Sequence, residues 1–145
     1  MYNELYQIKH MKITTRMIGD DLFESSNEAG NKVRIDMRKA SEKTGQSPVE
    51  MLQSALAACA GVEVAAMIRK RKKVVDGLRI EVTCVRNEEA PRWLKEIHCR
   101  YILTSPDANA DELEKVTRLA MEKYCSVASS LKSALTFSVE VERTN

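Results

Sequence analysis

The chain contains four cysteines, and a thiol is the side chain in this sequence best suited to act as a nucleophile or a redox group. Cys84 and Cys99 fall on the apolar faces of two predicted strands, where a free cysteine packs like a small hydrophobe. We therefore expect Cys84 and Cys99 to be buried and inert. Cys59 and Cys125 are the candidate working thiols.

Cys59 lies in the small-residue stretch LAACAGVEVAAM, residues 56–67. One interpretation is core packing, and the other is a thiol that a second segment or a small substrate can approach closely. Glu63 lies one helical turn after Cys59 on the same face. Because a carboxylate raises the pKa of a neighbouring thiol, we expect Glu63 to orient an arginine or cap a contact instead of activating Cys59.

Cys125 lies in EKYCSVASSL, at the junction of two helical patterns. If Cys125 begins the second helix, backbone N–H groups favour its thiolate. Otherwise Cys125 is a packed junction residue. Spacing alone does not show whether Cys59 and Cys125 meet.

No metal site or organic cofactor is predicted. His98 is next to Cys99, but adjacent strand residues point to opposite faces of a sheet. The chain has two histidines and no CxxC motif, so a zinc site is not expected.

Length and charge limit the class of protein. A chain of 145 residues with 43% hydrophobic and 30% charged residues is typical of one globular domain. The 23 basic residues nearly balance the 21 acidic ones, so there is no electrostatic case for a nucleic-acid partner. The run RKRKK, residues 69–73, is interpreted as a solvated helix end, with a nucleic-acid patch as the weaker alternative.

Compartment and membrane contact are judged from cysteine usage and hydropathy. Four cysteines without a secretory leader predict a reducing, cytoplasmic setting. The apolar run 52–68 approaches the length of a membrane span, but Gln53, Ser54 and Glu63 interrupt it. A buried helix is the better interpretation, and no membrane partner is expected.

The elements that position the thiols follow from periodicity and capping signals. Residues 1–10 are interpreted as an extension, residues 11–38 as two or three antiparallel strands, and residues 39–46 as a loop. Ser47, Pro48 and Glu50 form a helix start of the capping-box type, and that helix extends to about residue 72. Because the middle of this helix is apolar on nearly every side, it should lie at the centre of the fold.

The second half of the chain predicts a hairpin, two helices and a closing strand. Residues 77–89 and 93–105 alternate as two strands, with Leu78, Ile80, Val82 and Cys84 on one face of the first and Ile97, Cys99, Tyr101 and Leu103 on one face of the second. Residues 107–125 and 126–134 have helical patterns, and residues 135–143 form a strand. The predicted class is α+β, with an antiparallel sheet wrapped around a long central helix.

From about residue 11 onward the sequence resembles the OsmC and organic hydroperoxide resistance superfamily, in particular its OsmC-like, YhfA-type branch. The segments that carry the resemblance are SPVEMLQSALAACAG around Cys59, EEAPR before Trp93, and EKYCSVASSL around Cys125. The resemblance implies that residues 11–145 form a single OsmC-like domain and an intertwined homodimer.

The resemblance also implies an activity, the reduction of organic hydroperoxides by a cysteine-based peroxidase. Cys59 would be the peroxidatic thiolate and Cys125 the resolving thiol, and an external dithiol would reduce their disulfide. Glu50 would be the acid at the helix opening, and Arg16 the activating cation, with Arg38 as the fallback. The rival interpretation is a non-enzymatic OsmC-like dimer that binds an apolar small molecule or a thiol compound at its interface.

Overall fold

The computed structural model describes residues 11–144. These residues form two compact units, one up to Met51 and one from Leu52 onward, and each is described by itself. The predicted extension, residues 1–10, lies outside the described residues. That the chain forms a single domain stays a prediction.

The first unit contains an antiparallel sheet in the order β1-β2-β3. Its strands are β1 (Ile13–Gly19), β2 (Leu22–Asn27) and β3 (Lys32–Asp36). Gly30 has a φ of +84° in the turn before β3, a conformation that glycine adopts without strain. The expectation of antiparallel strands in this part of the chain is confirmed.

The long helix α1 (Pro48–Lys70) begins with the predicted capping box. The Ser47 backbone N–H donates to the Glu50 carboxylate at 2.7 Å, and the Glu50 N–H donates to Ser47 Oγ at 3.4 Å. The helix ends near the predicted position. Arg71 and Lys73, just beyond it, donate to the backbone oxygens of Glu112 and Asp107, which supports the interpretation of this basic run as a helix end.

The second unit contains a sheet in the order β4-β5-β6. Strands β4 (Gly77–Arg86) and β5 (Leu94–Thr104) form the predicted antiparallel hairpin. The two predicted faces meet pair by pair: Leu78 with Leu103, Ile80 with Tyr101, Val82 with Cys99, and Cys84 with Ile97.

Strand β6 (Ala134–Glu142) differs from the expectation, because it pairs with β5 in parallel. The prediction of a wholly antiparallel sheet is therefore wrong for this strand. The physical reason is the connection: a crossover that contains a helix brings the chain back to the same end of the sheet, and the next strand then runs parallel.

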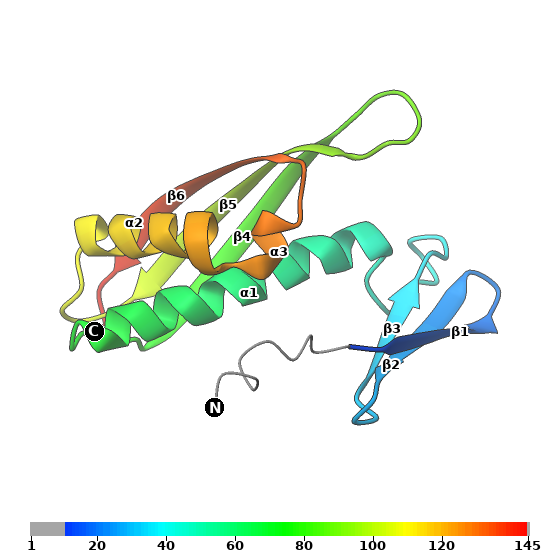
Figure 1. Ribbon diagram of the computed structural model, residues 1–145, viewed down its shortest axis with the longest axis horizontal. Helices are drawn as coiled ribbons and strands as arrows, with labels where there is room; N and C mark the ends of the chain where they lie inside the picture. Colours follow the sequence, from blue (N-terminus) through cyan, green and yellow to red (C-terminus); the bar gives the residue numbers. More distant parts are fainter. Residues whose placement is uncertain (1–10, 145) are drawn as a thin grey trace, which may run out of the picture. The chain divides into compact units, whose positions relative to one another are not determined.

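The crossover between β5 and β6 carries the remaining helical elements, as Figure 1 shows in yellow and orange. They are α2 (Ala110–Leu119), a π-helical turn η1 (Ala120–Tyr124), and the short α3 (Ser126–Ser129). The last helix is shorter than predicted. The two helical patterns meet at Cys125, as expected, and Cys125 is the N-cap residue of α3.

Within its own chain, α1 buries one face. Leu56, Ala60, Gly61, Val64 and Ile68 are buried. On the other side Val62 is 69% exposed, although it is apolar. A Cβ at Gly61 would lie 2.8 Å from Ile80 Cδ1, so the glycine permits close packing of α1 on β4. By length and composition α1 could also cross a membrane, a test that core helices of soluble proteins pass too.

Candidate functional site

Cys59 and Cys125 meet in the second unit. Cys59 lies on α1 and is partly exposed, whereas Cys125 is fully buried at the start of α3. The two thiols lie within interaction range of each other, and each shifts the pKa of the other. The structure thus answers the question that the spacing left open, because Cys59 and Cys125 lie near each other; their role as a working pair stays a prediction.

The Cys59 sulfur faces the turn that begins α3. The backbone N–H of Val127 is the strongest of several donors that lower the pKa of Cys59 below that of an ordinary thiol. Burial opposes the effect, and the thiol of Cys125 and the hydroxyl and backbone of Ser126 add to it. The Cys59 thiolate is therefore stabilised by neutral hydrogen-bond donors.

The Cys125 thiol is shifted in the opposite direction. Burial raises its pKa above the usual value, and the hydrogen bond and charge of Cys59 raise it further. The Ala128 N–H, which donates to Cys125 Sγ at 3.3 Å, offsets this only in part. The backbone N–H groups of Val127 and Ala128 at the helix start lower the pKa of Cys125, as expected, but burial and the neighbouring Cys59 outweigh them.

Because their pKa values are shifted in opposite directions, the two thiols are not chemically equivalent. The group with the lower pKa loses its proton first, so Cys59 is the more acidic of the two thiols. A thiolate that is partly exposed can attack an electrophile, and a buried thiol in contact with it can then close a disulfide. The arrangement can therefore perform two-electron thiol redox chemistry.

Cys99 lies near the pair but differs from it. It is fully buried on β5, and burial raises its pKa to about 11, with a further contribution from Cys125. The neighbouring Tyr101 donates its buried hydroxyl to Met121 Sδ at 3.1 Å. The expectation of a buried Cys99 is confirmed. Cys84, by contrast, is only half-buried, so the expectation of full burial is wrong for that residue.

Glu50 takes part in the start of α1. Its carboxylate accepts hydrogen bonds from the backbone and hydroxyl of Ser47, which lower its pKa, and Lys43 lies 3.5 Å away. The side chain is exposed. A capping role is therefore established for Glu50, and its assignment to the catalytic machinery stays a prediction.

The two candidate arginines lie in the first unit. Arg16 is exposed on β1 and pairs across the sheet with Glu24. Arg38, the fallback, is fixed by the buried Asp36: its Nε and Nη2 donate to the two carboxylate oxygens at 3.0 and 2.8 Å. That Arg16 or Arg38 is the activating cation stays a prediction.

Asp36 is a residue that the sequence analysis missed. Its fully buried carboxylate also accepts the backbone N–H of Thr44 at 2.8 Å, and these bonds, the one from Arg38 first, hold its pKa well below the usual range. A lone aspartate at the end of a short strand gives no signal of this. The loop between β3 and α1 is thereby tied to the sheet.

His98 lies on the other face of β5 from Cys99, as the strand period predicted. Its two ring nitrogens are 2.8 Å from Thr136 Oγ1 and 3.0 Å from Ser138 Oγ on β6. The imidazole therefore links two strands of the sheet through hydroxyl groups.

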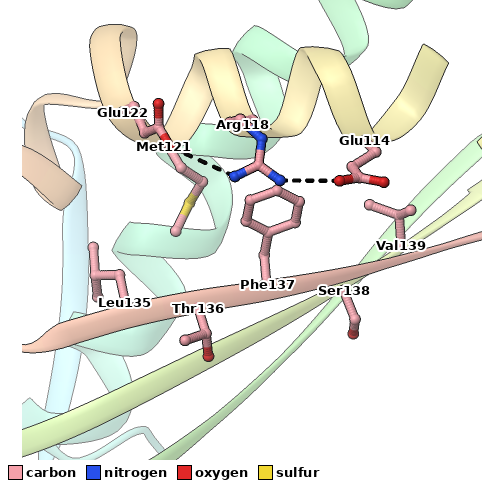
Figure 2. Close-up of a pocket in the computed structure, with 9 residues that line it drawn as sticks. All are labelled: Glu114, Arg118, Met121, Glu122, Leu135, Thr136, Phe137, Ser138 and Val139. Carbon is pink, nitrogen blue, oxygen red and sulfur yellow. Dashed lines mark hydrogen bonds and ion pairs between the residues drawn. The ribbon is translucent and has the colours of Figure 1, made fainter. Parts of the chain in front are cut away.

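A cavity of about 580 Å³ lies between β6 and the α2–η1 segment, and Figure 2 shows its lining. Arg118 stands 5.2 Å from the centre of the Phe137 ring and bonds Glu114 at 2.9 Å. Leu135, Val139 and Met121 supply apolar surface. Cys59 and Cys125 are not among the lining residues, so this cavity is separate from the thiol pair.

Known proteins resemble the part of the chain that contains Cys59 and Cys125. The family model for OsmC-like proteins matches residues 40–140, a range that contains both cysteines of the pair. Protein YhfA of Escherichia coli K12 is 31% identical to this chain over 121 residues, covering 82% of this chain and 89% of YhfA.

Solved structures share the fold. A hypothetical protein from Aquifex aeolicus superposes with a TM-score of 0.83 at 24% identity, covering 95% of this chain and all (100%) of that one. The organic hydroperoxide resistance protein OhrB of Bacillus subtilis superposes with a TM-score of 0.63 at 18% identity, covering 92% and 98% of the two chains. The chain belongs to the OsmC-like family, in the YhfA-type branch of the OsmC and organic hydroperoxide resistance superfamily.

Proposed function

We propose that this protein reduces organic hydroperoxides, with Cys59 as the peroxidatic thiol and Cys125 as the resolving thiol. The observation that carries the proposal is that a partly exposed Cys59 and a buried Cys125 lie within interaction range, with the pKa of Cys59 lowered and that of Cys125 raised. Membership of a family that includes an organic hydroperoxide resistance protein supports a role in the response to oxidants.

The reaction proceeds in three balanced steps. The Cys59 thiolate attacks the terminal oxygen of the hydroperoxide, the O–O bond breaks, and the alkoxide takes a proton and leaves as the alcohol. Cys59 is then a sulfenic acid. Cys125 attacks its sulfur, water leaves, and a Cys59–Cys125 disulfide forms. An external dithiol reduces that disulfide by exchange and restores both thiols.

A homodimer is the second part of the proposal. A groove of about 570 Å³ follows the open side of α1 and the edge of β4, lined by small and apolar residues that include Ala58, Gly61, Val62 and Ile80. An apolar surface of this kind on a helix is costly in water, and a second copy of the chain would cover it. We place the protein in the cytoplasm, where a dithiol reductant is available.

Glu50 and Arg16 are proposed to complete the site, with Arg38 as the alternative cation. The guanidinium of Arg16 is exposed, whereas the guanidinium of Arg38 is held in place by its bond to Asp36. A fixed guanidinium loses less side-chain entropy on binding an anion. Comparing Arg16→Ala with Arg38→Ala in the peroxide assay assigns the role.

The experiment that tests the function measures the consumption of hydroperoxide and the oxidation of the thiols in the same sample. Stoichiometric cumene or tert-butyl hydroperoxide should oxidise two thiols per chain and give one Cys59–Cys125 disulfide within each chain by peptide mapping. Excess hydroperoxide with a dithiol such as dithiothreitol should then turn over. Equal, slow oxidation of all four cysteines would contradict the proposal.

The same groove favours a second candidate function, binding of an apolar small molecule without turnover. In that case a fluorescent apolar probe would bind the protein, and treatment with hydroperoxide would not link Cys59 to Cys125. The peptide map described above therefore separates the two candidates.

A further inference from the structure

The cavity between β6 and the α2–η1 segment has the size of a small-molecule site. Its volume of about 580 Å³ lies within the roughly 300–1,000 Å³ that is usual for such sites. Leu135, Phe137 and Val139, at alternate positions of β6, point toward α2, and all three are only partly buried. The described residues therefore leave an apolar wall that a ligand can cover.

One cationic side chain lies over the middle of this wall. The Arg118 guanidinium is 5.2 Å from the centre of the Phe137 ring, as Figure 2 shows, and a ring face attracts a cation at this distance. The same guanidinium lies 2.9 Å from the carboxylate of Glu114 and 3.8 Å from that of Glu122. A ring face and two carboxylates thus surround one organic cation, which the chain itself supplies.

The charges at the cavity favour a cation over an anion as its ligand. Among the described residues that line it, two are carboxylates and one is a guanidinium, which leaves an excess of one negative charge. The side chains of Glu114, Arg118 and Glu122 are all more than half exposed. Because exposed ion pairs contribute little to stability, Arg118 can leave the Phe137 ring at a small cost in free energy.

We propose that this cavity binds an organic cation, an ammonium or guanidinium group attached to an apolar body. The cation takes the place of the Arg118 guanidinium over Phe137, between the two carboxylates, and the apolar body lies against the wall formed by β6. Because neither Cys59 nor Cys125 lines the cavity, binding here is independent of the proposed reduction of hydroperoxides.

The test is calorimetric titration of the full-length protein at pH 7 and physiological ionic strength with three probes of similar shape. The probes are 3-phenylpropylamine, which is a cation at this pH, the neutral alcohol 3-phenylpropanol, and the anion 3-phenylpropionate. The amine should bind more tightly than the alcohol, and the alcohol more tightly than the carboxylate. Equal or tighter binding of the carboxylate would overturn the proposal, and so would the absence of amine binding at millimolar concentration.

Variants of the charged residues show whether the amine binds at this cavity. Arg118→Ala removes the competing cation and should tighten binding of the amine about threefold, the value of an exposed cation–π contact. Glu114→Gln and Glu122→Gln together should weaken it about fivefold. Glu81→Gln is the matched control, because Glu81 lies on β4, pairs with Arg100 and does not line the cavity. Binding should be unchanged in that variant, since charges beyond the Debye length are screened.

Thermal melting of each variant shows whether the fold is kept, and Phe137→Leu supplies a further measurement. It removes the ring but keeps an apolar side chain, so it should weaken binding of the amine more than binding of the alcohol. Loss of amine binding in folded Arg118→Ala would overturn the proposal, because Arg118 would then hold the ligand instead of competing with it. Unchanged binding in the folded double variant of Glu114 and Glu122 would overturn it as well.

Discussion

The thiols of Cys59 and Cys125 interact and have pKa values shifted in opposite directions, while the Ala128 N–H donates to Cys125 Sγ at 3.3 Å. In the proposed function, Cys59 is the attacking thiol and Cys125 the thiol that resolves it. Removing Cys59 and removing Cys125 should accordingly have different effects.

The first prediction compares Cys59→Ser with Cys125→Ser. With Cys125→Ser the thiolate at Cys59 is kept, so the variant should consume one equivalent of hydroperoxide and leave a sulfenic acid that dimedone traps. Cys59→Ser should show no fast reaction, because the raised pKa of Cys125 keeps it protonated. Dimedone labelling of Cys125 in the Cys59→Ser protein would reverse the assignment.

The second prediction concerns pH. Attack requires the thiolate, so the rate of the reaction with hydroperoxide should fall as pH falls below the lowered pKa of Cys59. Cys125→Ala removes one donor to the thiolate and should move this profile to higher pH, whereas Cys125→Ser keeps a donor and should move it less. Identical profiles for the two variants would show that the thiol contact does not set the acidity of Cys59.

The third prediction concerns the remaining cysteines. Cys99→Ala leaves a small cavity under β5 and should lower the free energy of unfolding by on the order of 1 kcal/mol, measured by urea denaturation. Cys84→Ala should cost less, because Cys84 is only half-buried. Peroxide reactivity should be unchanged in both variants. Its loss in a folded variant would mean that a third thiol takes part.

The fourth prediction tests the homodimer. Val62 is 69% exposed on the open side of α1, so Val62→Lys should convert a dimer to a monomer in light scattering. Val85, 53% exposed on β4, is the matched control, and Val85→Lys should stay dimeric. A monomeric wild-type protein at micromolar concentration would contradict the proposed interface.

The fifth prediction concerns Asp36. Its pKa is lowered in the folded state by Arg38, so its stabilising effect is present above the unfolded-state pKa, about 4, and is lost as pH falls through the folded-state value. Asp36→Asn should lower the melting temperature at pH 7 and weaken the loss of stability in acid. Asp20→Asn, at an exposed position, is the control and should melt like the wild type.

Periodicity and capping predicted most of the fold. The two faces of the β4–β5 hairpin and the capping box at Ser47 depend on local patterns, so they are read directly from the sequence. The direction of β6 does not depend on its local sequence. The same alternation of residues fits a parallel or an antiparallel partner, and the crossover decides between them.

The sequence indicated which two thiols to examine but not the electrostatics around them. Cys59 and Cys125 were identified as the thiols, whereas the donors at Ser126 and Val127 depend on how α3 begins and on where α1 passes it. A π-helical turn before Cys125 has no clear sequence signature. The burial of Cys125, which reverses its expected acidity, also comes only from the three-dimensional packing.

The parallel pairing of β6 with β5 links the acidity of Cys59 to the completion of folding. The turn at residues 125–127 lies inside the crossover between these strands, so it is anchored at both ends only after β6 has docked. During synthesis β6 leaves the ribosome after β5 and the crossover, and contacts between distant segments form slowly. Until β6 pairs with β5, the turn that lowers the pKa of Cys59 is therefore anchored at one end only.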